Sequence, residues 1–283
     1  MEDRLRALWD FDDLDGTEAR LRTQLSAEAS ATGRAEVTAE LARVHGLRGT
    51  FEDGDALLDE AHGLGGGLPA VDARIDLERG RLRRSSGDPE AGRPLFESAY
   101  SSALESEQHF LAADAAHMVA LVAGDRDGFV EWTQRGIELA ERHESASYWR
   151  GPLLNNLGWE YYDAGEFGAA LDAFERAVGA RAEDEGNAQA TEIARFAVGK
   201  TLRALGRADD AIPLLEQAVA WAEAQNAPDG WFHEELAEEY AAVGRAADAG
   251  AQAALAIPLL ERDDPSFAGD AERSARLAAL ASA

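Results

Sequence analysis

Glycine recurs at a nearly constant spacing through this sequence. The intervals are 38, 37, 41, 41 and 38 residues, and the positions are Gly49, Gly87, Gly124, Gly165, Gly206 and Gly244. Each of these glycines ends one apolar stretch with helical periodicity and precedes another. A helix pair of this length buries one face only when a neighbouring pair stacks on it. The spacing therefore predicts a stacked array of helix pairs, with one glycine at the turn inside each pair.

The composition predicts an all-α fold. Hydrophobic residues make up 46% of the chain, good helix formers such as Ala, Leu, Glu and Arg are frequent, and no alternating strand pattern is present. A chain of 283 residues is long for one globular core, but a stacked array extends its core by adding units. We expect a single domain over residues 1–283, with an atypical first unit at 1–34, six repeats at 35–261 and a capping helix at 262–283.

The sequence lacks membrane-spanning and secretion segments, and it lacks cysteine. It has no run of 18 apolar residues, and its first residues lack the basic and apolar blocks of a secretion signal. We therefore expect a cytoplasmic protein with no membrane partner. The sequence contains no cysteine, which excludes disulfides, thiolate metal sites and a thiol nucleophile.

The net charge of −27 is spread evenly along the chain. Acidic and basic residues number 21 and 13 in residues 1–100, 18 and 8 in 101–200, and 15 and 6 in 201–283. A surface for one basic partner would concentrate the charge, so even acidity favours a role in solubility or adaptation to a high-salt host. Nucleic acid is excluded as a partner, because binding to phosphate backbones needs a positive surface.

The clearest repeat runs from Leu154 to Val178. Its small and large residues include Leu157, Gly158, Tyr161, Gly165, Ala170, Phe174 and Ala177. This unit resembles a tetratricopeptide repeat, and in that family's pattern the small residues lie where two helices touch and the large ones fill the gaps between them. The resemblance implies a right-handed superhelical solenoid of antiparallel helix pairs, with about six repeat units, that holds a protein partner.

A second resemblance covers most of the chain. The segment Trp9 to Asp13 reads Trp-Asp-Phe-Asp-Asp, and Leu-Asn-Asn-Leu-Gly-Trp follows at residues 154–159. Both are similar to motifs in a group of bacterial tetratricopeptide-repeat proteins without an assigned activity. This resemblance therefore implies an architecture rather than a reaction.

Three motifs suggest chemistry but lack a necessary part. Gly199-Lys200-Thr201 resembles the end of a phosphate loop, but Ala194 replaces the required first glycine, so we expect Gly199 to be a small residue at a helix contact. His233 opens a partial zinc-protease motif, but Ala237 replaces its second histidine. His109, Asp114 and His117 have helical spacing for a weak metal site, although surface or core histidines are the better interpretation. We expect no enzyme activity, cofactor or metal.

The resemblance implies that the first helix of each pair lines a concave groove. The second, fifth, ninth and twelfth positions of each unit usually face this groove. These 24 positions carry six bases and four acids, a net charge of +2, whereas the average charge of the chain predicts about −2 for 24 residues. Aromatic, amide and basic side chains in these helices predict a peptide site. The candidate partner-binding residues are Arg81, Arg84, Asn155, Asn156, Trp159, Tyr162, Phe196, Lys200, Arg203 and Trp231.

Three classes of function remain open at this point. The leading interpretation is a scaffold that binds a peptide or protein segment, with an acidic side chain or a C-terminal carboxylate, in its groove. The alternative is a regulatory sensor that binds a short peptide or a small anionic ligand. An enzyme would need a cluster of acids or histidines, and the candidates are scattered in the sequence.

Overall fold

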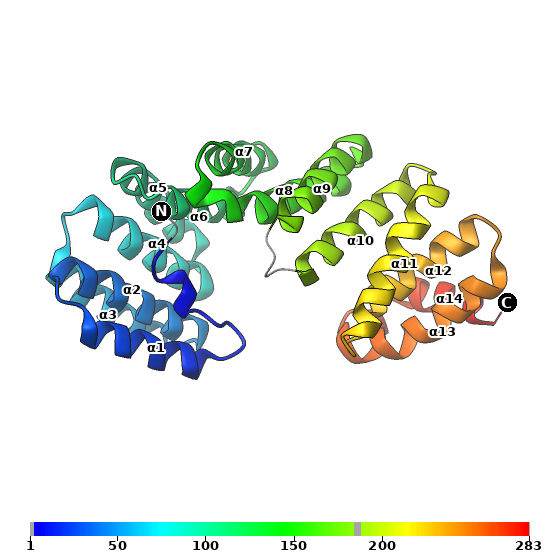
Figure 1. Cartoon of the computed structure of the whole chain (residues 1–283), viewed down its shortest axis with the longest axis horizontal. Helices are drawn as coiled ribbons and strands as arrows, with labels where there is room; N and C mark the ends of the chain where they lie inside the picture. Colours follow the sequence, from blue (N-terminus) through cyan, green and yellow to red (C-terminus); the bar gives the residue numbers. More distant parts are fainter. Residues whose placement is uncertain (1–2, 184–187, 283) are drawn as a thin grey trace. The chain divides into compact units, whose positions relative to one another are not determined.

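The computed structural model describes residues 3–183 and 188–282. These residues form helices joined by short turns, without a strand (Figure 1). The all-α helical-repeat fold predicted from the sequence is confirmed. Within these ranges, no helix combines the length and apolar character that a bilayer crossing requires.

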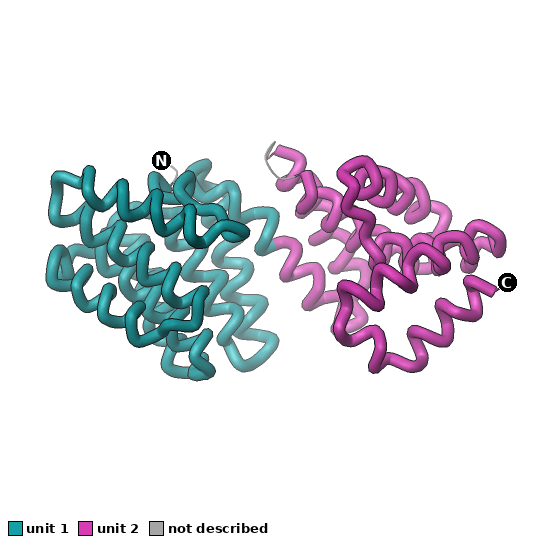
Figure 2. The backbone as a smooth tube through the Cα atoms, turned by 90° about the horizontal axis from the view of Figure 1, so that it is seen from below, with its two compact units in different colours: residues 1–153 teal, residues 154–283 magenta. Residues whose placement is uncertain are grey.

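The chain divides into two compact units, Met1–Leu153 and Leu154–Ala283 (Figure 2). We call them unit 1 and unit 2. The expectation of one continuous domain stays a prediction, and each unit is described by itself below.

Unit 1 begins with a short 3-10 turn and a single helix, followed by three helix pairs. A second 3-10 turn follows the last pair. The elements are η1 (Arg6–Leu8), α1 (Leu14–Ala27), α2 (Ala31–Leu47), α3 (Phe51–Gly65), α4 (Pro69–Ser85), α5 (Pro89–Glu105), α6 (His109–Leu121), α7 (Arg126–Arg142) and η2 (Glu144–Trp149). Helices α2, α4 and α6 are the first helices of their pairs.

Unit 2 contains the next three pairs and a terminal helix. Its first helix starts in the last residues of unit 1. The elements are α8 (Arg150–Asp163), α9 (Phe167–Ala182), α10 (Ala188–Ala204), α11 (Ala208–Ala224), α12 (Gly230–Ala242), α13 (Ala246–Asp263), η3 (Phe267–Gly269) and α14 (Ala271–Ala281). Leu277 on α14 is buried in a cluster with Ala253 and Leu260 of α13.

All six periodic glycines end a first helix in the left-handed backbone region. At Gly165, φ is 74°, the Gly165 N–H donates to the Tyr162 carbonyl, and the Glu166 N–H donates to the Tyr161 carbonyl at 2.8 Å. This is the hydrogen-bond pattern of a helix that stops at a glycine. The glycine period therefore marks the turns inside the pairs, as predicted.

Glycines also allow the two helices of a pair to touch. A Cβ atom at Gly158 would lie 2.5 Å from the Phe174 ring, and one at Gly199 would lie 2.8 Å from Leu215. In both pairs the large side chain stands 16 residues after the glycine and is fully buried. The prediction that Gly199 is a packing residue is therefore confirmed.

Two alanine substitutions in unit 2 should have opposite effects on stability. Gly165→Ala should cost about 1 to 2 kcal/mol, because its positive φ strains any side chain, although its Cβ would have open space. Gly179→Ala should stabilise by about 0.5 to 1 kcal/mol, because Gly179 is exposed inside α9 with ordinary helical backbone. Urea unfolding of the two variants measures both values, and equal effects would contradict the turn assignment.

Candidate functional site

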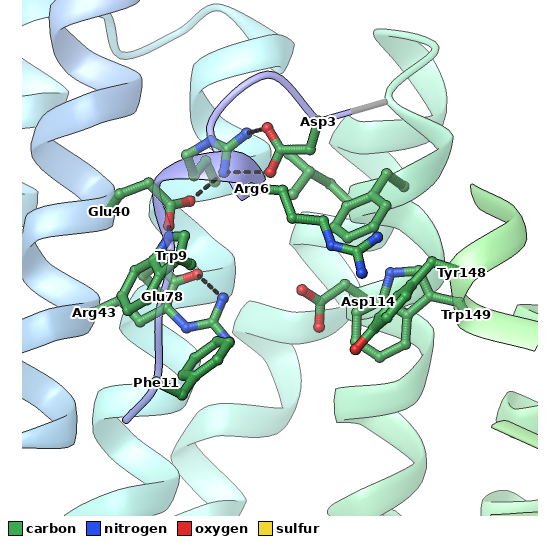
Figure 3. A pocket seen from close by; sticks show the side chains of 13 residues that line it. Asp3, Arg6, Trp9, Phe11, Glu40, Arg43, Glu78, Asp114, Tyr148 and Trp149 are labelled. Atoms are coloured by element: carbon green, nitrogen blue, oxygen red, sulfur yellow. Dashed lines mark hydrogen bonds and ion pairs between the residues drawn. The ribbon is translucent and has the colours of Figure 1, made fainter. Parts of the chain in front are cut away.

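A partly open cavity of about 80 Å³ lies between the start of the chain and the first helices of unit 1 (Figure 3). Aromatic rings form much of its wall. They are Trp9 and Phe11 from the start of the chain, Phe110 from α6, and Tyr148 and Trp149 from η2. The Phe110 ring centroid lies 5.7 Å from that of Trp149, and the Tyr148 and Trp149 rings meet edge to face at 5.5 Å. We call this space the unit 1 cavity.

The N-terminal segment, residues 3–13, lies on first helices of unit 1. Its Leu5 side chain is buried in a cluster with Leu21, Val37 and Leu41. The Trp9 Nε1–H donates to Glu40 of α2 at 2.6 Å. This segment is therefore held by both an apolar anchor and polar contacts.

The acids and arginines around the cavity form ion pairs between neighbouring first helices. Arg74 on α4 donates to Asp3 at 2.8 Å and also pairs with Glu40 on α2. Arg81 on α4 pairs with Asp114 on α6 and with Glu78 on its own helix. Burial opposes the charge of both arginines, yet the carboxylates raise the pKa of each above its ordinary value.

Glu78 is the least satisfied acid of this network. Its side chain is 1% exposed, and its Oε2 atom has no hydrogen-bond partner among the described residues. Burial raises the pKa of Glu78, while Arg81 and Arg43 oppose this shift. One residue of the cavity wall therefore has a buried oxygen without a hydrogen-bond partner among the described residues.

Two arginines at the cavity lie on aromatic rings. The Arg6 guanidinium stands 3.5 Å from the Tyr148 ring centroid and 5.5 Å from that of Phe110. Arg43 lies 5.0 Å from the Trp9 ring. Figure 3 shows Arg6 pointing toward Tyr148 and Trp149. In the part of the chain that the structure describes, no carboxylate forms an ion pair with Arg6.

Two predicted binding residues, Arg81 and Arg84, line a second cavity in unit 1 of about 190 Å³. Arg43 and Met118 also line this space. Arg84 is exposed, whereas Arg81 is engaged by Asp114 and Glu78. Arg43 also lines the unit 1 cavity, so the two cavities share this residue.

Three of the four predicted aromatic residues of unit 2 are half-buried. Trp159 packs edge to face on Phe174 at 5.0 Å and on Tyr162 at 5.5 Å. Phe196 lies 5.4 Å from Phe232, whereas Trp231 is 36% exposed. Trp159 therefore packs against the core, because its ring meets the buried Phe174 ring edge to face.

The amides of unit 2 occupy the same helix as Trp159. Asn155 and Asn156 lie on α8 and are half-buried. Their assignment to peptide binding stays a prediction, as it does for Trp159, Tyr162 and Phe196.

Lys200 and Arg203 are structural as well as surface groups. Both pair with Glu235 of α12, Lys200 at 3.1 Å and Arg203 at 3.2 Å through Nη2. Glu235 is buried, and despite that burial the two cations lower its pKa. Both cations neutralise a buried acid of the next repeat, and their assignment to partner binding stays a prediction.

Glu239 lies one turn after Glu235 and is fully buried. Neither of its carboxyl oxygens has a hydrogen-bond partner among the described residues, and the Arg203 Nε atom is 4.0 Å away. Burial, with the Glu235 charge acting in the same direction, raises the pKa of Glu239 to about 8. Its carboxyl group is therefore mostly protonated at neutral pH.

The weak metal site considered from the sequence does not assemble. His109 stacks on His143 with ring centroids 3.5 Å apart, and Asp114 pairs with Arg81. His117 lies against Trp149, and burial lowers its pKa. Within residues 3–183 and 188–282, no group of three or more possible ligands could hold a metal ion.

Sequence reasoning missed most of the unit 1 cavity. Arg6, Glu40, Glu78, Tyr148 and Trp149 were not among the candidates. One signal was available, because the paired charges are about one repeat apart: Glu40 precedes Arg74 by 34 residues, and Arg81 precedes Asp114 by 33. Tyr148 and Trp149 belong to a connecting turn, so the repeat pattern does not reach them.

Comparisons with known proteins support the repeat architecture. Residues 153–183 match the family described as Tetratricopeptide repeat. No curated protein matches the sequence.

Solved structures share the fold over most of the chain. BtubC from P. vanneervenii is 18% identical with a TM-score of 0.62, covering 80% of this chain and 93% of its own. The apo form of RapI is 12% identical with a TM-score of 0.73, covering 96% and 78%. The STAND protein PH0952 from Pyrococcus horikoshii is 12% identical with a TM-score of 0.70, covering 88% and 40%. At these identities the likeness concerns the fold.

Removing Arg203 should destabilise unit 2. We expect Arg203→Met to cost about 1.5 to 3 kcal/mol, because the buried Glu235 loses a charged hydrogen-bond donor. The control, Arg207→Met, should change stability by less than about 0.5 kcal/mol, because its pair with Asp210 is exposed. If chemical denaturation gives equal losses for both variants, the ion pair with Glu235 does not support the fold.

The raised pKa of Glu239 predicts a pH-dependent stability. As the pH rises from about 4.5 to about 8, the unfolded state loses this proton while the folded state keeps it, so folding weakens. Glu239→Gln removes this loss, and its melting temperature should exceed that of the unmodified chain by a margin that grows from pH 5 to pH 8. The control Glu223→Gln changes an exposed acid and should show no growing margin. A constant margin for Glu239→Gln would refute the raised pKa.

Proposed function

We propose that this chain is a non-enzymatic scaffold that binds a peptide or protein segment on its first helices. The supporting observation is the placement of the N-terminal segment. It runs over first helices of unit 1, where Leu5 is buried and Trp9 donates to Glu40. A surface that holds a segment of its own chain in this way has the contacts needed for a segment from another chain.

The contacts of the N-terminal segment indicate what kind of partner fits unit 1. A leucine enters an apolar cluster, a carboxylate meets Arg74, and an indole N–H meets Glu40. Such a surface selects by a combination of one apolar anchor and specific charges. The proposed partner segment for unit 1 therefore has mixed polar and apolar character.

A second candidate surface lies on α8, α10 and α12 of unit 2. It contains the residues proposed from the sequence, which are Asn155, Asn156, Trp159, Tyr162, Phe196, Lys200, Arg203 and Trp231. A partner with an acidic side chain or C-terminal carboxylate would compete with Glu235 for the two cations. The exposed Trp231 would supply apolar contact area for such a segment.

A regulatory sensor is the second candidate function. Among the structures with this fold, NprR from B. thuringiensis is described as a quorum sensor, and PH0952 is described as having a tetratricopeptide repeat sensor. A sensor would bind a short peptide or small anionic ligand and change conformation in response. X-ray scattering with and without the selected ligand distinguishes the two functions, because a plain scaffold keeps its scattering profile.

Peptides selected from a random display library against the full chain test the proposal. Arg84→Glu should weaken the unit 1 peptides that carry an acidic side chain by about tenfold, the factor that 1.4 kcal/mol represents, because it replaces an exposed cation on a first helix by an anion. Arg142→Glu changes an exposed arginine on the second helix α7 and should leave affinity unchanged.

Hydrogen exchange of the complexes locates the bound peptide. Protection is expected on α2, α4 and α6, or on α8, α10 and α12. If no peptide is selected, or if every peptide protects only second helices, the proposed function is wrong.

A further inference from the structure

We infer that the unit 1 cavity is a recognition pocket for an arginine side chain of the bound peptide, which enters in place of Arg6. This inference rests on the proposed function and names the chemistry of one of its contacts. It follows from the position of Arg6 on the aromatic rings, the net charge of the residues that line the cavity, and the Glu78 oxygen that lacks a hydrogen-bond partner among the described residues.

The present occupant shows that a guanidinium fits the aromatic walls. Arg6 lies 3.5 Å from the Tyr148 ring centroid (Figure 3) and 5.5 Å from that of Phe110. A guanidinium over an aromatic face is attracted by the electron-rich ring, and the attraction grows when water is excluded. The cavity therefore has the geometry of a cation site without further rearrangement of these rings.

The remaining wall charges favour a cation over an anion. Apart from Arg6, the cavity is lined by two bases, Arg43 and Arg74, and by four acids, for a net charge of −2. Arg81 pairs with two of these acids from outside the cavity, and counting it still leaves −1. An anionic group entering in place of Arg6 would therefore face net repulsion.

Glu78 supplies an acceptor for the incoming side chain. Glu78 lines the same cavity, and its buried Oε2 atom lacks a hydrogen-bond partner among the described residues. A guanidinium offers five N–H donors in a fixed plane, so it can stack on a ring and donate at its edge. A lysine ammonium is more strongly hydrated and cannot stack in this way, which is why we assign arginine.

Arg6 is suited to being displaced. It makes ring contacts but no ion pair with a described carboxylate, whereas Asp3 and Leu5 hold the same segment to Arg74 and to the apolar cluster. The side chain can therefore leave while the rest of the N-terminal segment stays in place.

The test uses the full chain and acetyl-arginine amide as the probe. Arg6→Ala empties the cation position and should bind the probe at least about tenfold more tightly than the unmodified chain, as measured by titration calorimetry. The uncharged isostere acetyl-citrulline amide should show no such gain. Tyr148→Leu added to Arg6→Ala should abolish the gain, because the stacking ring is lost.

Arg135→Ala is the matched control variant. Arg135 also covers an aromatic ring, at 4.5 Å from the Trp132 centroid, but it does not line the cavity. Its removal should give no gain in probe binding. A gain equal to that of Arg6→Ala would overturn the inference, because any uncovered ring would then suffice.

A second measurement covers the case in which Arg6→Ala does not fold. In the unmodified chain, titration with acetyl-arginine amide should shift the Nε–H signal of Arg6 in nitrogen-correlated NMR spectra. No shift, or equal binding of the citrulline probe, overturns the arginine pocket. If display-selected peptides still bind first helices, the proposed function survives that failure. If the probe binds but no peptide does, the pocket stands and the proposed function fails.

Discussion

Ion pairs between successive first helices are the interaction on which the candidate surfaces depend. In unit 1, Arg74 joins α4 to α2, and Arg81 joins α4 to α6. In unit 2, Arg203 joins α10 to Glu235 on α12. Each pair is partly or fully withdrawn from water, where an uncompensated charge would be costly. The matched charges therefore add to the apolar packing between first helices, and the groups that would bind a partner also help to hold the repeats together.

Arginine–glutamate pairs also hold the segments at both ends of the described chain to first helices. Arg4 in the N-terminal segment pairs with Glu36 on α2, and Arg273 on α14 donates to Glu234 on α12 at 2.7 Å. In an acidic protein with few bases, arginines placed over first-helix acids relieve repulsion where an array would otherwise expose an unpaired face. In unit 1 a cavity lies beneath the covering segment, and this cavity is where partner recognition is proposed.

The repeat architecture was predictable because each repeat requires the same kinds of residue at its turn and at its helix contact, so these residues recur at one spacing. A helix that turns sharply selects a glycine such as Gly165, and a close helix contact selects a small residue such as Gly158. The candidate site was less predictable. Whether Lys200 is free or paired depends on Glu235, 35 residues away on another helix, and the cavity depends on how residues 3–13 fold back. Such contacts join residues that are far apart in the sequence, and the residue pattern of a single helix does not predict them.

The central claim is that first helices of this chain bind a peptide. Paramagnetic relaxation tests it most directly, with a display-selected peptide carrying a spin label and the full chain observed by NMR. We expect broadening of the amide signals of α2, α4 and α6, or of α8, α10 and α12, with weak effects on second helices such as α7 and α11. Strongest broadening on the second helices would contradict peptide binding by the first helices.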